Sequence, residues 1–118
     1  MTIKQEIVMF KELTTQMNDT FAKKRHDYGQ TTEETYKKFG PVSMLTRMHD
    51  KMGRLDTLLV SGDKNHVEDE RVEDTLLDLA NYALITILEM RKAEYERTQA
   101  RIEEVPCVQH DDVFHILK

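Results

Sequence analysis

A stripe of acidic and amide side chains is the feature of this sequence best suited to chemistry. Its members are spaced by four, four and three residues: Glu70, Asp74, Asp78 and Asn81. At about 100° per residue, these positions lie within roughly 80° of one another on a helix. Asp78 and Asn81 fall among apolar residues, so we expect them to be buried. A buried carboxylate needs an ion pair, hydrogen bonds or a metal.

A basic stripe precedes it, formed by Arg47, Lys51 and Arg54 at steps of four and three residues. Only a short polar segment, 61–66, separates the two stripes. Two helices joined by so short a connection would lie antiparallel, which would let the stripes face each other. Gly53 interrupts the basic helix, and a glycine there usually marks the close approach of another backbone or of a ligand.

Three kinds of partner fit the acidic stripe. The first is the basic stripe itself, in an internal salt-bridge network. The second is Mg²⁺ on Glu70, Asp74 and Asp78, since Mg²⁺ takes carboxylate oxygens. The third is a phosphorylated ligand, with basic groups on phosphate, Asp78 and Asn81 on base or ribose edges, and an aromatic ring for stacking. The candidate ligand-binding set is Lys24, Tyr28, Arg47, Lys51, Arg54, Asp78, Asn81 and Tyr82.

Composition restricts the kinds of partner and the cellular location of the protein. The net charge of −5 argues against duplex nucleic acid, because few counterions would be released on binding. No apolar run reaches the roughly 20 residues of a membrane span, and the N-terminus is too short and too charged for a signal peptide. Cys107 is the single cysteine, so no intrachain disulfide can form. We expect a soluble cytoplasmic protein, located in the host cytoplasm if a phage encodes it.

The elements that must position these residues are helices. Charged residues make up 33% of the chain and aromatics 7%, with 4 glycines and 2 prolines, which is typical of an all-α protein. Apolar periodicity predicts helices over 2–27, 32–39, 41–60 and 68–104. The first carries the stripe Ile3, Ile7, Phe10, Leu13, Met17 and Phe21, and the third carries the seam Leu45, Met48, Met52, Leu55 and Leu59.

The last predicted helix is apolar on most sides in its first half, so most of its surface must be covered. Three other helices in one small chain can hardly do this. We therefore expect a small helical bundle that forms a homo-oligomer. We assign 1–105 to a single domain and 106–118 to a C-terminal tail.

Several motifs resemble the nucleotide-modification-associated domain family, which is found often in phages and prophages of Gram-positive bacteria. The resemblance covers about 23–90. It rests on an Asp-Tyr-Gly at 27–29, a Lys-x-x-Arg-Leu at 51–55 and an Asp-x-x-x-Asp-x-x-Asn-Tyr at 74–82. It implies a nucleotide ligand rather than a particular reaction.

A looser similarity is to the MazG-like all-α NTP pyrophosphohydrolases, which hold Mg²⁺ between two acidic helices. Glu70, Asp74 and Asp78 are rough counterparts of the second acidic helix. The first is incomplete, because Lys37 follows Glu33 and Glu34 where that motif has a carboxylate.

The sequence thus favours a phage-type protein that captures and sequesters a phosphorylated nucleotide or a cyclic nucleotide signal. Such capture would counteract a host defence or change the cellular nucleotide pool. A Mg²⁺-dependent pyrophosphohydrolase-like enzyme is the alternative. A non-catalytic interaction protein, whose stripes only pair with each other, is the second alternative.

Overall fold

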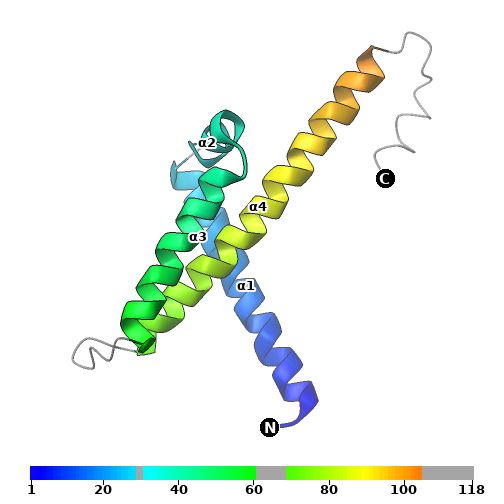
Figure 1. The fold of residues 1–118 in the computed structure, drawn as a ribbon. Helices are drawn as coiled ribbons and strands as arrows, with labels where there is room; N and C mark the ends of the chain where they lie inside the picture. Colours follow the sequence, from blue (N-terminus) through cyan, green and yellow to red (C-terminus); the bar gives the residue numbers. More distant parts are fainter. Residues whose placement is uncertain (29–30, 61–68, 105–118) are drawn as a thin grey trace. The chain divides into compact units, whose positions relative to one another are not determined.

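The fold of the chain is all-α in the computed structural model, which describes residues 1–28, 31–60 and 69–104 (Figure 1). In these ranges there is no strand, so the predicted fold class is confirmed. The elements are α1 (Ile3–Tyr28), α2 (Thr31–Phe39), α3 (Val42–Leu55), the π-helical segment η1 (Asp56–Val60) and α4 (Asp69–Glu103). Gly29 of the Asp-Tyr-Gly motif, the polar segment 61–66 and the tail 106–118 lie outside the described residues.

Local capping explains where two of the helices begin or end. At the start of α1, the Gln5 N–H donates to Thr2 Oγ1 (3.2 Å) and the Thr2 N–H donates to Gln5 Oε1 (2.8 Å), a reciprocal capping box. At the end of α2, Gly40 has φ +74° and its N–H donates to the Tyr36 carbonyl. Glycine adopts this left-handed conformation without the steric cost of a Cβ, so α2 stops there as predicted.

The third predicted helix is divided in the structure. Its last five residues form η1 rather than a continuation of α3. The N–H of Asp56 donates to the carbonyls of both Met52 and Gly53, and the Gly53 carbonyl also accepts the hydroxyl of Thr57 (3.2 Å). The Gly53 carbonyl is thus shared by two donors at the point where α3 ends and η1 begins.

The buried face of α3 is shifted from the predicted seam. Met48 is half-buried and Leu55 is buried, but Leu45, Met52 and Leu59 are about half exposed. Met44 is instead the most buried apolar side chain, at 1% exposure. The seam prediction was therefore wrong for three of its five members, because the helix turns the Met44 side toward the rest of the chain.

The chain divides into two compact units, 1–84 and 85–118, and α4 runs through the boundary between them. The first unit holds α1, α2, α3, η1 and the beginning of α4. In the second unit, the described residues carry ion pairs within the helix, at Glu89–Lys92 (3.1 Å) and Glu94–Arg97 (2.6 Å). None of the described helices has the length and apolar character needed to cross a membrane.

Candidate functional site

The two charged stripes meet where α3 and the beginning of α4 run in opposite directions (Figure 1). Lys51 Nζ lies 3.0 Å from Asp78 Oδ2. The guanidinium of Arg47 lies over the ring of Tyr82, 5.9 Å from its centroid. A step of four residues back along α3 therefore corresponds to a step of four residues forward along α4, which is an antiparallel register.

A third helix also contributes to this cluster. Lys24, near the end of α1, places its Nζ 3.7 Å from Asp78 Oδ1. Asp78 thus has an ammonium group beside each of its two oxygens, one from α1 and one from α3. The side chains of Lys51 and Asp78 are 21% and 31% exposed, whereas that of Lys24 is mostly in solvent. We call Lys24, Arg47, Lys51, Asp78 and Tyr82 the Asp78 cluster.

Charge and exposure make the Asp78 cluster suited to an anion. Three cationic side chains stand against one carboxylate, so an excess of positive charge remains after Asp78 is paired. Arg47 and Tyr82 are half-buried, and their separation is near the outer limit of about 6 Å for a cation–π contact. A ligand with a phosphate and a planar ring could contact both types of group here.

The remaining candidate residues differ in their exposure to solvent. Asn81 is half-buried, whereas Arg54 and Asp74 are exposed. The backbones of Tyr28 and Glu70 lie at the ends of α1 and α4, but their side chains fall outside the described part of the chain. The expectation of burial thus holds only in part, since Asp78 and Asn81 retain access to solvent.

Glu33, in the first turn of α2, is engaged with basic groups. Glu33 accepts a hydrogen bond from Arg25 (3.1 Å) and pairs with Lys37 (3.3 Å). Lys37 therefore occupies, as a partner of Glu33, the place where the pyrophosphohydrolase motif has a carboxylate. Among the described residues no group of three or more His, Cys, Asp or Glu side chains is arranged to hold a metal ion.

Sequence reasoning missed Thr75, which is buried at 3% exposure close to Asp78 along α4. Its hydroxyl donates to the Arg71 carbonyl one turn back (2.8 Å). A threonine in the middle of an apolar helix is the signal that could have revealed it, because such a hydroxyl can be buried when it bonds to the preceding turn.

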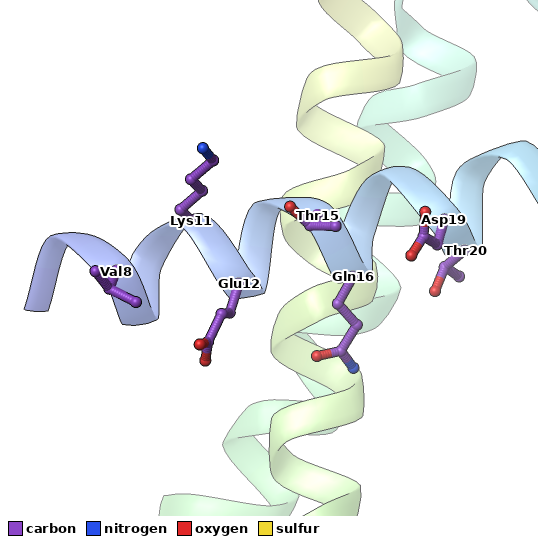
Figure 2. Close-up of a pocket in the computed structure, with 7 residues that line it drawn as sticks. All are labelled: Val8, Lys11, Glu12, Thr15, Gln16, Asp19 and Thr20. Atoms are coloured by element: carbon purple, nitrogen blue, oxygen red, sulfur yellow. The ribbon is translucent and has the colours of Figure 1, made fainter. Parts of the chain in front are cut away.

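A surface hollow on α1 lies apart from the Asp78 cluster. Figure 2 shows its seven lining side chains, which all stand on this one helix: Val8, Lys11, Glu12, Thr15, Gln16, Asp19 and Thr20. Side chains of a single helix cannot enclose a ligand, and none of the candidate residues is among them. We therefore place the candidate site at the Asp78 cluster.

The family comparison agrees with the sequence motifs. The model of the family described as nucleotide modification associated domain 1 matches residues 24–90, more than half of the chain. The chain therefore belongs to this nucleotide-modification-associated family, and the whole Asp78 cluster lies within the matched region. No curated protein and no solved structure matches the chain.

Proposed function

We propose that the protein binds a phosphorylated nucleotide at the Asp78 cluster. The observation that supports this most is the pairing of one carboxylate with two ammonium groups from different helices, at 3.0 and 3.7 Å. Family membership supports a nucleotide as the ligand, since the family is described by its association with nucleotide modification.

In the proposed complex, phosphate oxygens take the place of Asp78 as acceptors for Lys24 and Lys51. Charge-assisted hydrogen bonds of this kind are roughly twice as strong as neutral ones. Before the ligand arrives, Asp78 holds both lysines in position, which lowers the entropy lost on binding. Arg47 and Tyr82 offer a guanidinium and a ring to the rest of the ligand, and Asn81 offers an amide to a base edge.

Capture fits the described donors better than Mg²⁺-dependent hydrolysis does. Both oxygens of Asp78 already lie beside ammonium groups, which repel a divalent cation and attract phosphate. We therefore propose a protein that holds its nucleotide intact and so removes a nucleotide or cyclic nucleotide signal from circulation.

We further propose that the protein works as a homo-oligomer. Leu45 and Met52 on α3, and Leu76 and Leu84 on α4, are each about half exposed in the single chain. A second copy of the chain would remove these apolar side chains from water.

The direct test is to identify what the purified protein carries and what it binds. Nucleotide released by heat is identified by mass spectrometry, and calorimetric titration follows against mononucleotides and cyclic mono- and dinucleotides, with and without Mg²⁺. Lys24→Met and Lys51→Met should each weaken binding about tenfold, as expected for loss of one charge-assisted contact. Lys23→Met, which removes the same charge from the neighbouring position, should leave the dissociation constant unchanged.

Two results would overturn the proposal. One is the absence of binding to every nucleotide of the panel by a folded protein. The other is an equal loss of affinity in the Lys23→Met control, which would mean that overall charge and not the Asp78 cluster holds the ligand. Release of pyrophosphate from the bound nucleotide would show hydrolysis in place of capture.

A further inference from the structure

The apolar stripe of α1 continues beyond the part that the rest of the chain covers. Leu13, Met17 and Phe21 are half-buried. Their counterparts nearer the N-terminus are in solvent, with exposures of 74% for Ile3, 63% for Ile7 and 69% for Phe10. The two halves of the stripe lie on one helix face, so the exposed half is an apolar surface without a partner among the described residues.

A coiled-coil seam overlaps this stripe, with the exposed Thr14 at the position beside the half-buried Leu13. Its positions advance by alternate steps of four and three residues, through Ile3, Ile7, Phe10, Thr14, Met17 and Phe21. This period of 3.5 residues places Ile3 and Phe10 at d positions and Ile7 and Thr14 at a positions. Thr14 can enter such a seam at little cost, because its hydroxyl already donates to the Lys11 carbonyl (2.9 Å).

Two charges flank the exposed half of the stripe and indicate the orientation of a partner helix. In this heptad Glu6 is at a g position and Lys11 at the following e position. They are five residues apart, on opposite sides of the stripe, so they cannot pair with each other within the helix. In a parallel, in-register pair of identical helices, g of one chain faces the next e of the other. Glu6 of each copy would then meet Lys11 of the second copy.

An antiparallel pair lacks this complementarity, because it brings g against g and e against e. Lys4 and Lys11, both at e positions, would then face each other, and Glu6 would meet no basic group. The hollow on another side of the helix is lined mostly by polar side chains, Glu12, Thr15, Gln16 and Asp19 among them, together with the apolar Val8 (Figure 2). We infer that the N-terminal half of α1 docks on the same segment of a second copy of this chain, as a short parallel coiled coil. The capping box at Thr2 and Gln5 keeps this segment helical from its first residues, so little order has to be gained on docking.

This inference is independent of nucleotide binding and identifies one contact surface of the oligomer. Cysteine cross-linking tests it in the full chain, with Cys107→Ser as the background. In a parallel, in-register pair, each a or d position faces itself across the seam. Ile3→Cys and Thr14→Cys should therefore each give a disulfide-linked dimer on mild oxidation. Thr15→Cys, on the face turned away from the seam, should not.

Cross-linking at both position 3 and position 14 distinguishes a parallel from an antiparallel pair of helices. No antiparallel register lets both position 3 and position 14 face themselves, so a cross-link at only one of them would overturn the parallel arrangement. Absence of cross-links at both positions, or equal cross-linking through Thr15→Cys, would overturn the surface itself. The readout is unaffected by any other interface that the chain forms.

Charge exchange provides a second measurement. Glu6→Lys and Lys11→Glu should each raise the dissociation constant of this contact by roughly tenfold at low salt, since each creates two like-charge pairs. The double variant Glu6→Lys/Lys11→Glu exchanges the charges and should restore association to within about twofold of the natural chain. Sedimentation velocity measures the association, and circular dichroism confirms that these exposed substitutions leave the helices intact. A double variant that associates no better than the single variants would overturn the proposed pairing.

Nucleotide titration of the same variants separates the two proposals. The charge-exchanged variants alter α1 far along the chain from Lys24, so a loss of association with unchanged nucleotide affinity supports both proposals. A loss of nucleotide binding through Lys51→Met with intact cross-linking at Ile3→Cys concerns only the Asp78 cluster.

Discussion

Lys51 Nζ and Asp78 Oδ2 are 3.0 Å apart across the antiparallel helices α3 and α4, and the same register places Arg47 over Tyr82 one turn away. The contact joins the basic and acidic stripes that the sequence displays separately. It also explains why Lys51, a charged residue, stands on the covered side of α3 together with Met44 and Leu55. A partner on the facing helix makes that position tolerable for a cation.

Removal of Asp78 alone should destabilise the protein. In Asp78→Leu, Lys51 keeps its partly buried position without its partner, and we expect the free energy of unfolding to fall by about 1 kcal/mol. Lys51→Met/Asp78→Leu should recover most of that loss, because neither charge is then left alone. Urea unfolding measures both. Asp74→Leu, at an exposed position one turn away, is the control and should change stability little. A double variant no more stable than Asp78→Leu would contradict a direct coupling.

The two described glycines should respond to alanine in opposite directions. A Cβ added at Gly53 meets nothing within 4 Å, so Gly53→Ala should stabilise α3 by about 0.5–1 kcal/mol through helix propensity. Gly40 is equally open but has φ +74°, so Gly40→Ala should cost about 1 kcal/mol of backbone strain. Thermal unfolding compares the two variants. A destabilised Gly53→Ala variant would show that another molecule approaches α3 at that point, as the sequence suggested.

Truncation of neighbouring side chains on α3 should reveal which face is covered. Met44→Ala should cost about 2–3 kcal/mol, because Met44 is only 1% exposed and a cavity would remain. Leu45→Ala removes a side chain that is half exposed and should cost less than about 1 kcal/mol. The comparison should be made by chemical unfolding at low protein concentration. Equal costs at the two positions would mean that a second copy covers Leu45.

One pair on the second part of α4 should titrate measurably. The hydrogen bond from Arg97 and its positive charge hold the pKa of Glu94 below the ordinary glutamate value. The stabilisation from this pair is therefore complete above the ordinary pKa and is lost as the pH falls through the lowered pKa. Carbon NMR titration of the Glu94 carboxyl should show the low value, and Arg97→Gln should raise it. Arg71→Gln should leave the Glu94 titration unchanged. Because the Glu94 side chain is exposed, the effect on overall stability should be small.

Helix positions were predictable from the sequence because local chemistry sets them. Thr2 and Gln5 cap one helix, and Gly40 ends another in the conformation that glycine permits. The buried face of α3 was less predictable, because Leu45 and Met44 are adjacent and either could have turned inward. The ion pair between Lys51 and Asp78 accompanies the orientation in which Met44 is covered. That contact depends on two segments separated in sequence, so periodicity within one helix could not define it.

The partners of Asp78 were only partly predictable. An antiparallel pairing of the stripes anticipates Lys51, whereas the approach of Lys24 depends on the path of α1. The π-helical segment η1 could not be predicted from periodicity either, because the apolar spacing through Leu59 is that of an ordinary α-helix.

The sharing of Asp78 by Lys24 and Lys51 makes the two lysines thermodynamically dependent on each other. When one of them is removed, the carboxylate interacts more fully with the other, so the effects of the two single substitutions should not add. A double-mutant cycle on Lys24 and Lys51 would then report a coupling energy between two side chains that act through a common acceptor. Substitutions tolerated on α1 would in this way depend on the residue present on α3, a form of epistasis fixed by a single carboxylate.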